Sequence, residues 1–153
     1  MNQKLTKLEK RWILYDVGNS AFVLLTSTII PIYYKNIASA SGISDSDSTA
    51  FFGYATSLVT ILVAVLGPVL GTLADTKGFK KPVFTFFMMM GVLGCAGLAL
   101  PATWVAFLAV YVLAKTGLNA SLVFYDAMLP DVTTDERMDV VSAQGYAWGY
   151  IGS

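Results

Sequence analysis

Residues 71–81 read GTLADTKGFKK, and this short stretch decides the fold of the chain. It separates two long apolar segments with a carboxylate, a glycine turn and three lysines, which are Asp75, Gly78, Lys77, Lys80 and Lys81. A soluble domain gains little from a basic hairpin between two such segments. In a membrane protein, the apolar segments lie in hydrocarbon and the lysine-bearing loop stays on the cytoplasmic side. The stretch therefore predicts a membrane protein.

The composition points the same way. Of the 153 residues, 56% are hydrophobic and 13% are charged, whereas charged residues make up about 25% of a soluble domain. Basic and acidic residues balance at ten each, which gives no indication of nucleic-acid binding. The chain has no histidine, and its single cysteine, Cys95, lies in an apolar segment. We therefore expect no metal site, no cofactor and, without a nucleophile–base pair, no enzyme.

Four apolar segments are long enough to cross a bilayer as helices, which takes about 20 residues each. They cover residues 12–34, 50–74, 83–100 and 104–124, and a fifth begins near Val140. A crossing cannot stop halfway without leaving backbone groups unpaired. We therefore expect residues 1–153 to be the N-terminal part of a longer protein.

The connections between these segments carry their own predictions. The serine-rich residues 35–49 predict a disordered or turn-forming external loop. Pro101, Ala102 and Thr103 form a minimal turn that makes the third and fourth segments antiparallel neighbours. Thr133 and Glu136 have the spacing of a capping box, which predicts that a helix restarts near residue 134.

The basic residues predict the orientation. Lys35 lies on one side of the membrane, while eight basic residues share the other: Lys4, Lys7, Lys10, Arg11, Lys77, Lys80, Lys81 and Arg137. Because basic loops stay in the cytoplasm, the N-terminus should be cytoplasmic. A cleaved secretory signal is the competing reading, but residues 12–34 exceed the usual apolar core of about 7–15 residues.

Polar residues within the predicted spans are candidates for a solute-binding cavity: Asp16, Asn19, Lys115 and Asn119. Intramembrane charges are costly and mark substrate or ion routes. The other reading is structural, with hydrogen bonds to neighbouring helices or a lysine that snorkels to water. Helix rise permits an Asp16–Lys115 pair and places Asp126 ~16 Å from Lys115. A carboxylate and an ammonium facing one space would suit a zwitterionic solute.

Small residues recur at helical spacing, which predicts close packing of helix backbones. The third segment has Gly91, Gly94 and Gly97, and the fifth has Gly145 and Gly149. The second segment has a longer stripe: Gly53, Ser57, Thr60, Ala64, Gly67 and Gly71. There, a hinge at Gly67–Pro68 is the alternative, because proline removes a backbone hydrogen bond.

The loop at residues 71–81 resembles the signature between helices two and three of major facilitator superfamily transporters, which reads roughly Gly-x-Leu-Ala-Asp-Arg-x-Gly-Arg-Lys. The matching positions are Gly71, Leu73, Ala74, Asp75, Gly78, Lys80 and Lys81. The loop departs at Thr76, where Lys77 supplies the usual basic charge, and at Phe79. In that superfamily, the loop carboxylate meets a helix end of the other half and helps to hold one access state. The resemblance implies a gating role for Asp75; a topology anchor with a helix-capping Asp75 is the alternative.

Three further segments resemble the vacuolar-effluxer-like branch, the autophagy-related amino-acid effluxers. They are WILYDVGNSAF at residues 12–22, VFYDAMLP at 123–130 and QGYAWGYIGS at 144–153. Tyr125 and Asp126 mark the exit of helix four, where asparagine often replaces Asp126. The resemblance implies an all-α membrane protein containing helices one to four and the start of helix five of a twelve-helix major facilitator fold.

The same resemblance implies a secondary active transporter that moves a small solute, such as an amino acid, by alternating access. The implied partners are the solute, a coupling proton, the lipid bilayer and the C-terminal half of the same protein, and nucleic acid is not among them. The implied location is the plasma (inner) membrane of a bacterium or the vacuole of a fungus. The alternative from another class is a non-transporting polytopic membrane scaffold or assembly factor.

Overall fold

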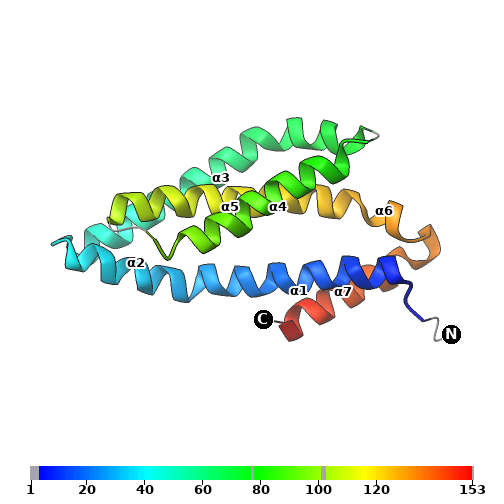
Figure 1. Ribbon diagram of the computed structural model, residues 1–153, viewed down its shortest axis with the longest axis horizontal. Helices are drawn as coiled ribbons and strands as arrows, with labels where there is room; N and C mark the ends of the chain where they lie inside the picture. The colour runs from blue at the N-terminus through cyan, green and yellow to red at the C-terminus, as the bar shows by residue number, and fades with distance from the viewer. Residues whose placement is uncertain (1–3, 77, 101–102, 153) are drawn as a thin grey trace.

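The computed structural model describes residues 4–76, 78–100 and 103–152, and all regular structure within them is helical (Figure 1). The elements are α1 (Lys7–Ser27), α2 (Ile29–Ala40), α3 (Asp45–Asp75), α4 (Lys80–Gly97), α5 (Trp104–Ala127), α6 (Leu129–Val132), the short 3₁₀ helix η1 (Asp135–Arg137) and α7 (Met138–Gly152). The prediction of an all-α chain is confirmed.

Helices α1 and α2 form one long rod along the lower edge of the bundle (Figure 1). The rod is interrupted at Thr28, because Pro31 has no N–H to donate to the carbonyl of Ser27 and its ring crowds that carbonyl. Lys7–Ala40 is 34 residues long, or ~51 Å at the α-helical rise. The apolar segment 12–34 is therefore only the middle of the rod, and both ends extend beyond a hydrocarbon core of about 30 Å.

One prediction about the connections is wrong, and another is right in position but not in its cap. The external loop was expected at residues 35–49, but α2 continues to Ala40, and α3 begins at Asp45 behind a cap in which Ser44 Oγ accepts from Asp47 N. The helix restart expected near residue 134 is confirmed, because η1 begins at Asp135 and runs directly into α7 at Met138. The cap differs, since the Thr133 hydroxyl donates to Glu9. Local spacing cannot predict this long-range bond, which uses the side chain that the capping box required.

Three helical segments are long and apolar enough to cross a membrane, among the residues that the structure describes: Lys7–Ala40, Asp45–Asp75 and Trp104–Ala127. Helix α4 has 18 residues and starts with Lys80 and Lys81, so its apolar part falls short of the usual span. The segment predicted at residues 83–100 thus corresponds to α4, which is not among these three helices. The turn expected at Pro101 and Ala102 lies outside the described residues, but α4 and α5 do pack against each other.

Helix α5 is the centre of the bundle (Figure 1). It contributes to all three apolar clusters: Tyr111 packs with α2 and α3, Tyr125 with α1 and α7, and Phe124 with the C-terminal half of α3. Half of its most apolar segment is buried, against 17% for the α1–α2 rod and for α3. The outer helices thus leave large apolar side chains exposed, such as Leu14, Val65 and Phe86. This surface requires hydrocarbon rather than water, so the chain is an integral membrane protein.

The glycines of α4 allow its backbone to approach α5, as the sequence predicts. A Cβ atom at Gly94 would lie 2.8 Å from Ala114 Cβ, and one at Gly91 would lie 2.6 Å from Leu118 Cγ. Both distances are shorter than any normal contact. The stripe on α3 differs, since a Cβ at Gly53, Gly67 or Gly71 would meet nothing within 4 Å. Close packing is therefore confirmed for the third segment, whereas α3 leaves these glycines uncovered within the described residues.

Gly94→Val should destabilise the full-length protein by about 1–3 kcal/mol, because the added methyl groups overpack the α4–α5 contact. Gly53→Val is the matched control, since it makes the same helical substitution where the structure leaves room. The measurement is thermal unfolding of the detergent-purified proteins. Equal losses in the two variants would show that helix propensity, and not the contact with Ala114, determines the effect.

Candidate functional site

The polar face of α1 opens onto two adjoining pockets. The first has a volume of about 340 Å³ and is lined by Asp16, Asn19, Ser20 and Ser27 of α1 together with Tyr146 and Tyr150 of α7. The second has a volume of about 240 Å³ and shares Asp16, Asn19 and Tyr146 with the first. Helix α5 contributes Tyr125 and Asp126 to it, and α7 contributes Ser142. Two of the predicted cavity residues, Asp16 and Asn19, therefore lie together at the wall of a cavity.

Glycines of α7 bring it close enough to α1 to form these pockets. A Cβ at Gly149 would lie 2.8 Å from Ser20 Oγ and 2.9 Å from an Asp16 carboxylate oxygen. A Cβ at Gly145 would lie 2.8 Å from the Trp12 ring. The close packing predicted for Gly145 and Gly149 is thus confirmed, and it places the Asp16 carboxylate directly beside the α7 backbone.

Aromatic side chains join α1 to the exit of α5. The Trp12 ring stacks on Tyr125 with centroids 4.2 Å apart, and Trp12 Nε1 donates to the Tyr125 carbonyl at 3.1 Å. Tyr15 Oη lies 2.6 Å from Ser121 Oγ and is the donor, because the Ser121 hydroxyl donates to the Leu118 carbonyl. These contacts hold Tyr125 rigidly and position Asp126, the next residue, at the second pocket. The sequence marked Tyr125 and Asp126 by resemblance alone and assigned no partner to either.

Lys115 binds α1 at a different level from Asp16. Its Nζ donates to Thr26 Oγ1 at 2.8 Å and lies 5.6 Å from the centroid of the Phe22 ring. Thr26 follows Asp16 by ten residues on α1, which places the two ~15 Å apart along the axis. The Asp16–Lys115 pair that helix rise permits is therefore not formed, and the two charges do not face one compact site. Asn119 lies one turn further along α5 and is partly buried.

Thr26 is a site residue that the sequence analysis did not select. Its side chain is 4% exposed, and its hydroxyl donates to the Val23 carbonyl while accepting from Lys115. It lies on the same face of α1 as Asp16, so the helical period provides the signal. A buried hydroxyl with a free lone pair is a natural acceptor for an intramembrane ammonium.

The loop between α3 and α4 also differs in part from its prediction. Asp75 is the last residue of α3 and is exposed, so it does not cap a helix N-terminus. Gly78 takes a φ of +88°, which explains the glycine. Lys80 Nζ pairs with Asp131 Oδ2 at 2.8 Å and donates to the Ala127 carbonyl at 3.0 Å. This ion pair joins the predicted gating loop to the loop after α5.

The other predicted residues of this loop fall as follows. Gly71 lies within α3, and Lys81 lies in the first turn of α4. Lys77 lies outside the described residues. Asp75, Gly78, Lys80 and Lys81 line a pocket of about 580 Å³ at this end of the bundle.

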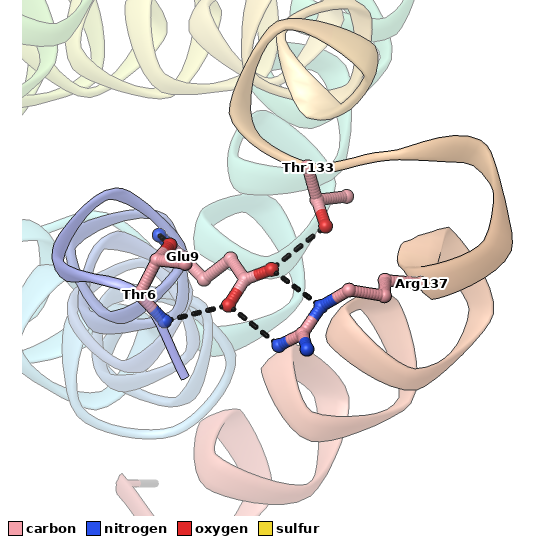
Figure 2. A network of polar contacts seen from close by, with 4 residues as sticks. All are labelled: Thr6, Glu9, Thr133 and Arg137. Atoms are coloured by element: carbon pink, nitrogen blue, oxygen red, sulfur yellow. Dashed lines mark hydrogen bonds and ion pairs between the residues drawn. The ribbon is translucent and has the colours of Figure 1, made fainter. Parts of the chain in front are cut away.

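A polar network ties the start of α1 to the segment before α7, and it is absent from the sequence analysis (Figure 2). Arg137 donates to both oxygens of Glu9, at 3.0 Å from Nε and 2.9 Å from Nη2, and Thr133 Oγ1 donates at 2.7 Å. The Thr6 N–H donates to Glu9 Oε2 at 2.7 Å, which completes a capping box. The Glu9 side chain is 1% exposed. The Thr6-x-x-Glu9 spacing could have predicted the capping box, but it gives no indication that Arg137 also binds Glu9.

Glu9 precedes Trp12, where the apolar part of the rod begins, so it lies outside the membrane-spanning segment. Burial by itself would raise the pKa of its carboxyl. The hydrogen bonds from Thr6, Thr133 and Arg137, together with the guanidinium charge, outweigh burial and lower the pKa to about 2. Glu9 is therefore ionised at every physiological pH, and the ion pair with Arg137 persists.

Within the described part of the chain, no three His, Cys, Asp or Glu side chains are grouped closely enough to hold a metal ion. The arrangement offers instead a polar cavity wall inside an apolar bundle. Such a wall can bind and release a solute or an ion, because its polar groups face a pocket while the outer surfaces face lipid.

Comparison with known proteins gives two matches. The family described as "Vacuole effluxer Atg22 like" matches residues 6–145. A protein of Bacillus subtilis (strain 168), named "Uncharacterized MFS-type transporter YxiO", is 45% identical over 156 residues, which cover 100% of this chain and 36% of that protein. The chain thus spans about a third of the length of this relative. No solved structure matches.

Proposed function

The chain belongs to the vacuole effluxer Atg22-like family, and we propose on this premise that the whole protein is a secondary transporter that moves a small solute across a membrane by alternating access. The described helices represent the first four transmembrane helices and the start of the fifth of a major facilitator fold. The Bacillus subtilis relative is named as an MFS-type transporter, which supports the proposal. Neither match favours the scaffold alternative, and the proposal includes no catalytic step.

The observation that carries the proposal is the position of Asp16 and Asn19. Both belong to a membrane-spanning helix, and both line the two adjoining pockets between α1, α5 and α7. A carboxylate in a membrane span is too costly to be kept as filler. Facing a cavity, it can meet the ammonium group of an amino acid, and the Asn19 amide can accept or donate a hydrogen bond beside it. Amino acids are therefore the solute class that we propose.

Lys115 and Asn119 belong to the proposed route at a second level. Because Lys115 lies ~15 Å from Asp16 along α1, one small zwitterion cannot contact both charges in this conformation. We place Lys115 at a separate position, where it links α5 to Thr26 of α1. In the proposal, solute passing along the polar face of α1 reaches the two charges in sequence.

The test is uptake into liposomes that contain the purified full-length protein. The probe is a mixture of the twenty labelled L-amino acids, offered with an inward proton gradient, an inward sodium gradient or no gradient. We expect at least one amino acid to accumulate well above its level in protein-free liposomes. Failure of every amino acid under all three conditions would contradict the proposed solute class.

Orientation is a further part of the proposal. With eight basic residues on one side against Lys35 on the other, the N-terminus and the loop containing Asp75 and Lys81 face the cytoplasm. Because the named relative is bacterial, we propose the cytoplasmic membrane as the location. Exposed on that side, Asp75 and its neighbouring lysines are placed to contact the other half of the transporter and to stabilise one access state.

A cysteine at position 81 checks the orientation. In Lys81→Cys, a membrane-impermeant maleimide should label the protein only after the cells are permeabilised. Labelling of intact cells at that position would reverse the proposed orientation and remove Asp75 from the cytoplasmic side.

A further inference from the structure

Two carboxylates that are far apart in the chain face the same small pocket. Asp16 comes from α1 and Asp126 from the last turn of α5, and both line the pocket of about 240 Å³. The rest of the wall includes the apolar side chains of Trp12, Leu122 and Leu129. Two like charges in such a low-dielectric setting repel each other strongly unless a cation or a proton compensates them.

Three cationic side chains of the described residues have other partners. Arg137 is bound to Glu9, Lys80 to Asp131, and Lys115 to Thr26. Throughout the residues that the structure describes, no ion pair involves Asp16 or Asp126. Within this part of the protein the two carboxylates therefore have no basic side chain to compensate them, which favours a bound cation or proton.

A third group in the pocket wall points independently to a ligand. Tyr125 is 5% exposed, yet its buried hydroxyl has no hydrogen-bond partner among the described atoms. The hydroxyl interacts electrostatically with both carboxylates and with the hydroxyls of Tyr15 and Tyr146. Leaving a buried hydroxyl unsatisfied costs about 1–3 kcal/mol. Tyr125 lines the pocket, and the stack on Trp12 holds its ring in this position, so the unpaired hydroxyl lies in the wall that Asp16 and Asp126 share.

The available ligand atoms identify the class of ion. The pocket offers oxygen from two carboxylates, from the Tyr125 and Ser142 hydroxyls and from the Asn19 amide, and it offers neither imidazole nor thiolate. Oxygen-only sites select hard cations. Calcium usually takes about six to eight oxygen ligands, and magnesium sheds its water reluctantly. A monovalent hard cation is the better fit.

We propose that Asp16, Asp126 and the Tyr125 hydroxyl form a binding site for one monovalent cation, either a proton or sodium. The inference rests on the proposed function in one respect, since it assigns the site of the ion that drives transport. Binding itself does not depend on that function. Loading and release of the cation change the repulsion between α1 and α5, in a pocket whose third wall is α7.

The test follows sodium binding to the full-length protein in detergent through tryptophan fluorescence, which Trp12 reports because it stacks on Tyr125. Sodium chloride replaces choline chloride at constant ionic strength, at pH 8 and at pH 6. We expect a saturable change whose midpoint shifts to higher sodium at pH 6, because protons compete for the carboxylates. In sodium-free buffer, a pH titration of the tryptophan fluorescence should report proton binding to the carboxylates alone.

The variants identify the residues. Asp16→Asn and Asp126→Asn should each weaken sodium affinity at least tenfold or, for a proton site, shift the proton-binding constant at least tenfold. Tyr125→Phe keeps the ring stack and should change the same constant several-fold. Asp139→Asn is the matched control, because Asp139 is an exposed carboxylate in the first turn of α7. Asp16→Glu should retain a cation response with an altered midpoint, which separates loss of the site from loss of folding.

Each outcome has a definite meaning. A sodium response lost in both asparagine variants supports a sodium site, and a proton transition lost in both without a sodium response supports a proton site. A wild-type protein with neither response, or a response to calcium chloride alone, overturns the inference. Uptake is measured separately. If the protein transports a solute but binds no cation, only the proposed cation site is refuted. If it binds the cation but transports no solute, only the proposed function is refuted.

Discussion

Arg137→Met should destabilise the full-length protein by about 3–5 kcal/mol, because it leaves the Glu9 carboxylate buried without its counter-ion. The carboxylate is 1% exposed, whereas the arginine side chain is 23% exposed. Glu9→Gln should therefore cost less, since the charge that it leaves behind is on the more exposed side chain. The double variant should lose clearly less than the sum of the two single losses, which a double-mutant cycle of thermal or denaturant unfolding measures.

The ion pair between Lys80 and Asp131 provides the matched control. The Asp131 side chain is 60% exposed, so Asp131→Asn should change stability by no more than about 1 kcal/mol. A loss as large as that of Arg137→Met would mean that burial does not distinguish the two pairs.

The pH dependence follows from the same network. The pKa of Glu9 is about 2 in the folded protein, below its ordinary value of about 4.3 in an unfolded chain. The stabilisation is therefore complete above about pH 4.5 and is lost as the pH falls through the folded pKa. The Glu9→Gln side chain cannot titrate, so the stability difference between wild type and Glu9→Gln should stay constant from pH 8 to pH 5. A difference that shrinks within that range would contradict the assignment.

Lys115→Ala should abolish solute uptake while leaving the amount of protein in the membrane unchanged. The ammonium is a charge near the middle of α5, held by Thr26 and positioned near the Phe22 ring. Intramembrane charges at such positions serve the route of a solute or ion. The measurement is liposome uptake together with quantification of the membrane-inserted protein. Uptake at the full rate would refute the role.

Two further variants separate charge from packing at this position. Thr26→Val removes the acceptor but keeps the ammonium, so uptake should fall only in part. Lys35→Ala removes a lysine that pairs with Asp45 at the far end of the rod, and it should leave uptake unchanged. Loss of membrane protein in Lys115→Ala alone would assign Lys115 to the folding of the bundle.

Much of the fold was predictable because it depends on local sequence. Apolar length predicts the crossing segments, and glycine at helical spacing predicts where backbones approach, as at Gly94 and Gly149. The polar face of α1 follows from the helical period, which is why Asp16 and Asn19 were correctly grouped before any contact was known.

The remaining features depend on which helices become neighbours, and no local pattern determines that. Glu9 and Arg137 are 128 residues apart, and nothing near either of them indicates the other. The same limit explains why the sequence suggested Asp16 as the partner of Lys115. Helix rise gives a height along an axis, but the tilt and rotation of α1 against α5 decide that Thr26 meets the lysine.

The tight glycine contacts divide the helices into two units. Side chains of α1 pack directly on the glycine backbone of α7, and side chains of α5 pack in the same way on the glycines of α4. Between the two units, the main polar and aromatic joints are the Trp12–Tyr125 stack and the bonds from Tyr15 and Lys115. Sliding of α7 along α1, or of α4 along α5, would bring atoms into steric clash. The Trp12–Tyr125 stack and the hydrogen bonds of Tyr15 and Lys115 can instead break by rotation of a few side chains. The Tyr15 hydroxyl, the Trp12 indole and the Lys115 ammonium are thus the groups whose bonds must break and re-form if α1 moves relative to α5.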